Sequence, residues 1–122
     1  MGSDKKILFV DDDSDFLEAT QLMLMDEGYD VIPATNGEEA VAKYKEFEPA
    51  IVFLDIKMPG IDGYETFFRI QKADPDVRAV FTSSYAIDNE KLKRAKDLSL
   101  RGLLNKPLEL DDIKKFIKKH AK

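Results

Sequence analysis

Three aspartates stand directly after two continuous apolar segments of the chain. Asp11 and Asp12 follow residues 7–10, and Asp55 follows residues 50–54. If these segments are adjacent parallel strands, their carboxyl ends bring the three carboxylates into one crevice. Two such charges ~4 Å apart repel by roughly 4 kcal/mol at an effective dielectric constant of 20, which raised pKa values or a bound cation would relieve. Oxygen ligands without His or Cys favour a hard ion, so the pattern predicts a Mg²⁺ site.

A hydroxyl and a lysine follow the fourth and fifth predicted strands. Ser83 follows residues 77–82, and Lys106 follows residues 101–105. Neighbouring strands are ~5 Å apart, so Ser83 is expected one strand spacing from Asp55 and Lys106 about 10 Å away. The long aliphatic stem of a lysine covers much of that gap. Acids, hydroxyl and ammonium at successive strand ends predict a phosphate site with a metal on one side and a lysine on the other.

The segments that carry these residues alternate between short apolar strands and amphipathic helices. The predicted strands are residues 7–10, 29–34, 50–54, 77–82 and 101–105, and helices are expected to begin near residues 14, 36, 64, 87 and 110. Strict alternation predicts an α/β fold in which a five-stranded parallel sheet is doubly wound by helices on both faces. In that arrangement the strand order is 2-1-3-4-5, with the ligand crevice between strands 1 and 3. The aspartates at residues 11–13 replace the glycine-rich loop that a Rossmann dinucleotide site requires.

Length and composition exclude several other classes of protein. The 122 residues suit one domain, and we expect residues 5–120 to form it, after a disordered start or cloning remnant at residues 1–4. The net charge of −5 argues against a nucleic-acid partner, and the absence of cysteine excludes a disulfide scaffold and a cysteine nucleophile. The longest apolar run has five residues, far fewer than the ~20 that span a bilayer, so we expect a cytoplasmic protein without membrane contact.

Four stretches of the sequence resemble the receiver domain of two-component response regulators. They are residues 7–13 (ILFVDDD), 51–63 (IVFLDIKMPGIDG), 81–85 (FTSSY) and 106–107 (KP). The resemblance extends from residue 5 to about residue 119, and the second stretch is very specific. It implies the flavodoxin-like (βα)5 fold and a switch in a phosphorelay: a stand-alone or excised module that signals to an effector protein, catalyses its own phosphorylation and slowly removes the phosphoryl group.

The resemblance assigns the acids to phosphoryl transfer and metal binding. Asp55 would accept a phosphoryl group from the phosphohistidine of a sensor histidine kinase or phosphotransfer protein. Asp11 and Asp12 would hold Mg²⁺, with Asp12, Asp55 and the backbone carbonyl of Lys57 as direct ligands.

The resemblance also assigns the hydroxyl and the lysine. Ser83 would bind one phosphoryl oxygen and Lys106 another, while Lys57 and Tyr85 occupy positions that modulate dephosphorylation. Thr82 is adjacent to Ser83, so the hydroxyl could be displaced by one residue. The peptide bond after Lys106 is expected to be cis.

Two departures from the family pattern affect the expected output surface. Leu103 stands three residues before Lys106, where the family commonly has a Tyr or Phe that turns inward on phosphorylation. The preceding turn, residues 99–101, reads Ser-Leu-Arg where Gly-Ala is usual. The surface formed by the fourth helix and fifth strand is therefore expected to differ from that of typical relatives.

Two alternative functions remain open at this point. A haloacid-dehalogenase-type phosphatase would use Asp11 rather than Asp55 as its nucleophile, with residues 111–112 among its later motifs. A degenerate receiver would bind proteins without being phosphorylated. An EF-hand loop starting at Asp11 is excluded, because Phe16 and Leu22 stand where Gly and Glu are required.

Overall fold

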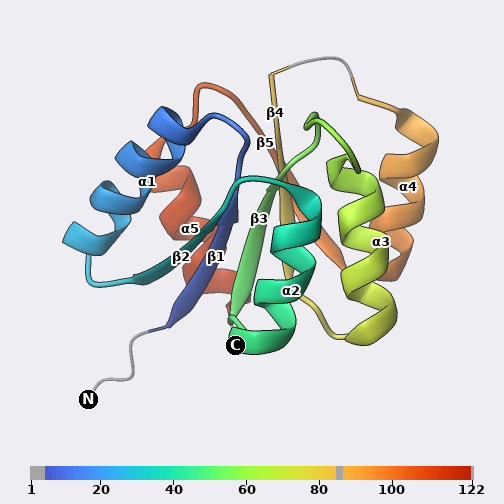
Figure 1. Ribbon diagram of the computed structural model, residues 1–122, viewed down its shortest axis with the longest axis horizontal. Coiled ribbons are helices and arrows are strands. Elements are labelled where there is room, and N and C mark those ends of the chain that lie inside the picture. The colour runs from blue at the N-terminus through green and yellow to red at the C-terminus, as the bar shows by residue number, and fades with distance from the viewer. Residues whose placement is uncertain (1–4, 85–86, 122) are drawn as a thin grey trace.

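The computed structural model describes residues 5–84 and 87–121 and shows a parallel sheet with helices on both faces (Figure 1). The strands are β1 (Lys6–Val10), β2 (Asp30–Ala34), β3 (Ile51–Asp55), β4 (Ala79–Ser83) and β5 (Leu100–Asn105). The helices are α1 (Ser14–Asp26), α2 (Gly37–Phe47), α3 (Gly63–Ala73), α4 (Asn89–Leu98) and α5 (Leu110–His120). The strand order is β2-β1-β3-β4-β5, so the predicted doubly wound α/β fold and its topology are confirmed.

The continuous apolar run of β1 reflects its position in the middle of the sheet. Its four apolar residues are fully buried, and they alternate between the two faces. Ile7 and Phe9 belong to the hydrophobic cluster that includes α1 and α5, whereas Leu8 and Val10 belong to the cluster that includes α2, α3 and α4. A strand covered on both faces needs apolar side chains at every position, which is why the sequence shows no alternation here.

The sheet register aligns the strand ends that carry the aspartates. Strands β1 and β3 are parallel neighbours, and Val10 pairs with Leu54. The next residues, Asp11 and Asp55, therefore emerge at the same level of the same edge. The order of the strands along the sheet reverses between β1 and β3, and a crevice is expected at such a point.

Four of the helices begin with a side-chain cap that fixes the preceding loop. The caps are Asp13 for α1, Asn36 for α2, Asp62 for α3 and Asp88 for α4. Each side chain accepts a hydrogen bond from a backbone N–H in the first turn of its helix. Because Asp88 is a cap, α4 begins at Asn89, two residues after the expected start.

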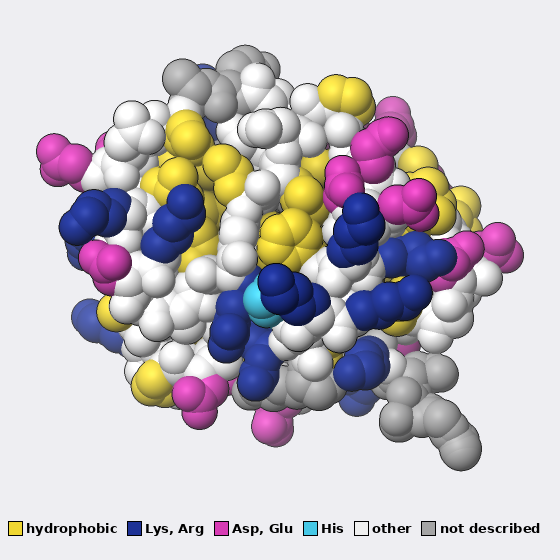
Figure 2. Space-filling view, turned by 180° about the vertical axis from the view of Figure 1, so that it is seen from behind, with side chains coloured by type: hydrophobic (Ala, Val, Ile, Leu, Met, Phe, Trp, Pro, Cys, Tyr) yellow, Lys and Arg dark blue, Asp and Glu magenta, His cyan; other side chains and the backbone are white. Residues whose placement is uncertain are grey.

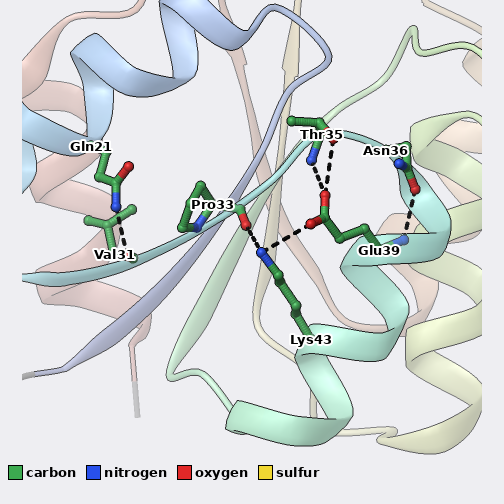
Figure 3. Close-up of polar contacts among 7 residues, drawn as sticks. All are labelled: Gln21, Val31, Pro33, Thr35, Asn36, Glu39 and Lys43. Atoms are coloured by element: carbon green, nitrogen blue, oxygen red, sulfur yellow. Dashed lines mark hydrogen bonds and ion pairs between the residues drawn. The ribbon is translucent and has the colours of Figure 1, made fainter.

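Side chains from two helices satisfy the outer edge of β2 (Figure 3). The Gln21 side-chain amide of α1 donates to the carbonyl of Val31 at 3.3 Å, and the Lys43 ammonium of α2 donates to the carbonyl of Pro33. Lys43 also pairs with Glu39, at 3.1 Å. Proline has no backbone N–H to donate, and it is tolerated here because β2 is the outermost strand of the sheet.

The helices are short, and each buries only one of its faces against the sheet. The longest, α1, has 13 residues and buries Leu17 and Leu24 while leaving Leu22 and Met25 exposed. Within the part of the chain that the structure describes, no helix combines the length and apolar content needed to cross a bilayer.

Candidate functional site

Three carboxylates converge at the carboxyl ends of β1 and β3. Asp11, Asp12 and Asp55 each place a carboxylate oxygen within 4.8 Å of the others'. Asp11 is 1% exposed and Asp55 is 5% exposed, whereas Asp12 faces solvent. The structure thus brings together the three aspartates that the sequence selected. Their donor set is oxygen only, which is the ligand chemistry that Mg²⁺ prefers.

Lys106 places its ammonium group between two of these carboxylates. Its Nζ lies 2.6 Å from Asp11 Oδ2 and 3.5 Å from Asp55 Oδ2. The backbone N–H of Lys106 donates to the carbonyl of Ser83 at 2.8 Å, which ties the end of β5 to the end of β4. The peptide bond that follows Lys106 is cis, as expected. The lysine therefore reaches Asp55, two strands away in the sheet, and Asp11, three strands away.

The crowding of charge perturbs the ionisation of two groups. Burial and the nearby charge of Asp11 raise the pKa of Asp55 to about 6, against the opposing effect of Lys106. Burial alone would lower the pKa of Lys106, but its hydrogen bond with Asp11 and the charges of Asp11 and Asp55 raise it above the usual value. The lysine thus stays protonated and acts as an internal counter-ion for the acids.

The acids and the lysine line an open cavity with a volume of about 520 Å³. Its walls are Asp11, Asp12, Asp13, Asp55, Lys57, Met58, Pro59, Ser84 and Lys106. Lys57 is exposed at the rim, two residues beyond the end of β3. A space of this size at a strand switch point, with charges converging on it, is typical of a binding site for a small polar group.

Three consecutive hydroxyls occupy different environments at the end of β4. Thr82 pairs with Asp55 in the sheet register and is fully buried, and its Oγ1 has no hydrogen-bond partner among the described residues. Ser83, the predicted hydroxyl, is buried one residue further on, opposite Asn105 of β5. Ser84 is exposed and lines the cavity, although its place in the sequence did not predict a role in the site. Tyr85 lies outside the described residues.

Gly63 also shapes the site, although it was not among the predicted site residues. It is the last residue of the stretch 51–63 that resembles the receiver family. A Cβ at this position would lie 2.4 Å from the carbonyl oxygen of Asp55, so only glycine lets α3 start this close to β3. Its N–H donates to the carbonyl of Ile56 at 2.7 Å and closes the loop of residues 57–62. The signal in the sequence was a glycine directly after the helix cap Asp62.

The comparisons with known proteins agree with this geometry. The family model for the response regulator receiver domain matches residues 7–118, and the chain belongs to this family. Among curated proteins it is 30% identical over 116 residues to sporulation initiation phosphotransferase F of Bacillus subtilis, covering 95% of this chain and 93% of that protein. It is 34% identical over 106 residues to the chemotaxis protein CheY of Halobacterium salinarum, covering 86% and 87% respectively.

Solved structures of the same family superpose on the whole domain. A CheY-like response regulator receiver domain protein from Methanospirillum hungatei has a TM-score of 0.88 at 30% identity, covering 96% of this chain and 93% of that one. The CheX-CheY-BeF3-Mg complex from Borrelia burgdorferi has a TM-score of 0.85 at 28% identity, covering 97% and 90%. This membership contradicts the alternative of a haloacid-dehalogenase-type phosphatase.

Proposed function

We propose that this receiver domain, residues 5–120, accepts a phosphoryl group on Asp55 from a phosphohistidine of a sensor histidine kinase or phosphotransfer protein. A carboxylate oxygen of Asp55 forms the new bond to phosphorus, the phosphorus–nitrogen bond breaks, and the imidazole leaves. The observation that carries the proposal is the position of this carboxylate, which borders the cavity within 3.5 Å of an ammonium and 4.8 Å of two other acids.

The acids fit a magnesium ion that would assist the transfer. Asp12, Asp55 and the backbone carbonyl of Lys57 are the proposed direct ligands, with Asp11 beside them. A bound Mg²⁺ offsets the negative charge that the carboxylates and the phosphoryl oxygens bring together. Lys106 supplies the second positive charge from the other side of the cavity. Positioning and charge stabilisation of this kind provide most of the catalysis of phosphoryl transfer.

Lys106 and a hydroxyl of β4 would hold the transferred group. Lys106 needs only to exchange its contact with a carboxylate for one with a phosphoryl oxygen, because it already lies between Asp11 and Asp55. Ser83 is the proposed hydroxyl. Thr82 is the competing candidate, since it pairs with Asp55 and its hydroxyl lacks a partner among the described residues. Comparing Ser83→Ala with Thr82→Val separates the two. Only loss of the hydroxyl that donates to a phosphoryl oxygen should speed release of the phosphoryl group.

The output of the switch would be a change in protein contacts. Inward movement of the hydroxyl and of Lys106 would shift the loops before α4 and α5, so that the α4 side of the molecule binds an effector protein in the cytoplasm. Leu103, half-buried in β5 against the core, occupies the place of the usual aromatic. We propose that this surface relays the signal without an aromatic side chain that turns inward. Lys57 and Tyr85 are the proposed modulators of the protein's own slow dephosphorylation.

Labelling with a small phosphodonor such as acetyl phosphate tests the proposal directly. The wild type should gain one phosphoryl group by mass spectrometry in the presence of Mg²⁺ and none after chelation. Asp55→Asn should abolish the gain, whereas the matched variant Asp88→Asn, which keeps a capping side chain at a residue that does not line the cavity, should label normally. Undiminished labelling of Asp55→Asn would overturn the assignment.

A second measurement tests whether the domain is a binding module only. Adding beryllofluoride with Mg²⁺ should change the amide NMR signals around Asp55 and Lys106 in the wild type. A protein that neither labels nor responds to beryllofluoride would contradict the proposed phosphoacceptor function and favour the degenerate receiver.

A further inference from the structure

We propose that Phe16 is a positioning residue that holds the ammonium group of Lys106 in the cavity. The inference rests on the proposed function, because Lys106 is the group that would bind the phosphoryl oxygen. Phe16 lies in the first turn of α1 and is only half-buried. From the sequence alone it belongs to the apolar stripe of that helix, so its type and spacing do not indicate a role in the site.

The contact itself is a cation–π interaction. Lys106 Nζ lies 4.7 Å from the centroid of the Phe16 ring, within the range at which a ring face attracts an ammonium group. The same nitrogen donates to Asp11 at 2.6 Å and lies 3.5 Å from Asp55. The ammonium therefore contacts two carboxylates and an aromatic ring. Partial burial of this lysine strengthens such an attraction relative to a fully exposed pair.

A series of contacts that begins and ends at Asp11 holds the Phe16 ring beside Lys106. Asp11 Oδ1 accepts the backbone N–H of Asp13 at 2.9 Å, and Asp13 Oδ1 accepts the backbone N–H of Phe16 at 3.1 Å. The Phe16 ring then faces Lys106, and Lys106 donates back to Asp11 Oδ2. One aspartate thus anchors both the helix start that carries the ring and the lysine that the ring contacts.

The ring is also supported from the core. The Phe9 ring of β1 lies 6.4 Å from the Phe16 ring, tilted by 54°. Phe9 in turn stacks on Phe53 of β3, with centroids 5.2 Å apart and planes 17° apart. Both inner rings are fully buried. A column of three rings therefore extends from the middle of the sheet to the ammonium of Lys106, and it limits how far Phe16 can move.

The type of contact suits a lysine that must change partners. A hydrogen bond to a carboxylate requires an aligned N–H, whereas the attraction of a ring face for a cation is broad in direction. Lys106 can keep its contact with Phe16 while one of its donors moves from Asp11 or Asp55 to a phosphoryl oxygen. The ring thus restricts the ammonium to the cavity without using any of its three donors.

Three variants test the inference on the full chain. Phe16→Leu removes the ring and keeps an apolar side chain, and Phe16→Tyr keeps the ring as a conservative rescue. The matched control is Phe68→Leu, because Arg94 lies over the Phe68 ring at 4.6 Å, in an equivalent cation–π contact between α3 and α4. Two properties are measured: the rate of labelling by acetyl phosphate, and the NMR signals of the Lys106 ε-methylene group in the protein without Mg²⁺.

We expect Phe16→Leu to slow labelling by about twofold to thirtyfold, the range that corresponds to the strength of a cation–π contact from exposed to desolvated sites. Its Lys106 ε-methylene signals should lose the shift that the ring current produces. Phe16→Tyr should restore both properties, and Phe68→Leu should change neither. Labelling of Phe16→Leu at the wild-type rate would overturn the positioning role, with or without a change in the NMR signals. Failure of the wild type to label would instead overturn the proposed function, and the NMR comparison would still decide whether the ring holds the ammonium.

Discussion

Gly63 approaches Asp55 so closely that a Cβ on the glycine would lie 2.4 Å from the Asp55 carbonyl oxygen. The glycine also donates its N–H to the carbonyl of the following residue, Ile56, at 2.7 Å. Helix α3 therefore starts against the last residue of β3. The strand end that presents the Asp55 carboxylate is therefore held in place by the backbone at the start of α3.

Substitution Gly63→Ala should disturb both stability and the site. The added methyl group must displace backbone atoms, and overpacking of this kind costs about 1–3 kcal/mol. We expect a lower free energy of unfolding in urea and slower labelling of Asp55. Gly28→Ala is the control: nothing lies within 4 Å of its Cβ, but its φ of +93° strains alanine. That control should lose stability and label normally, and an unchanged stability of Gly63→Ala would contradict the close approach.

Removal of the lysine should expose the repulsion between the acids. Lys106→Met leaves Asp11 buried without its counter-ion. Breaking a fully buried pair costs about 3–5 kcal/mol, and we expect a somewhat smaller loss here because the Lys106 side chain is 18% exposed. The loss should be largest without Mg²⁺ and should shrink as Mg²⁺ is added, as measured by urea unfolding at several metal concentrations. Lys114→Met breaks an ion pair with Glu27 of the same 2.6 Å length on the surface, and its effect should be smaller and independent of Mg²⁺. Equal, metal-independent losses in both variants would refute this account.

The raised pKa of Asp55 predicts a pH dependence of stability. Its pKa is about 6 in the folded protein, against an ordinary value of 3.8. Between these values the folded state binds the proton more tightly than the unfolded state, so this group makes the protein less stable as the pH rises through that window. Asp55→Asn removes the titration, and without Mg²⁺ it should be more stable than the wild type at pH 7 by on the order of 1–3 kcal/mol. Below the ordinary pKa the difference should vanish, whereas parallel pH profiles of the two proteins would show that Asp55 is not perturbed.

A tyrosine of α3 fixes the start of α4. The hydroxyl oxygen of Tyr64 accepts the backbone N–H of Asp88, the α4 cap, at 3.0 Å. Tyr64→Phe leaves that N–H without its partner, which costs about 1 kcal/mol and should speed amide hydrogen exchange in the first turn of α4. Tyr44→Phe is the matched control, because its hydroxyl bonds Asp74 after α3 instead. Unchanged exchange at α4 in Tyr64→Phe would mean that other contacts hold the helix start.

The fold and the position of the acids could be predicted from the sequence because both depend on where each buried strand lies and where it ends. A continuous apolar run that stops at an aspartate marks a buried strand and the edge where it emerges, as with Asp11 and Asp55. The same logic located Lys106, whose long side chain tolerates an error of one or two residues in the strand boundary. These features follow from periodicity and topology, which a single sequence records.

The remaining features depend on side-chain direction and on distances of a few tenths of an ångström. Three consecutive hydroxyls follow Phe81, and the sequence does not distinguish the buried Thr82 and Ser83 from Ser84 at the cavity wall. The contact between Phe16 and Lys106 joins residues 90 positions apart and depends on how α1 is rotated. The requirement for Gly63 arises because the backbones of α3 and β3 approach closely, and helix or strand propensities of single residues do not predict such an approach.

The polar contacts along β2 determine how this molecule can meet other chains. The unpaired backbone groups of an edge strand can form hydrogen bonds with a strand of another chain, which can lead to aggregation. Here Gln21 and Lys43 already occupy the oxygens of Val31 and Pro33. A polypeptide arriving from that side would have to displace an amide and an ammonium group before it could align. The two outward-facing carbonyl groups of β2 are therefore shielded by side chains of the domain itself.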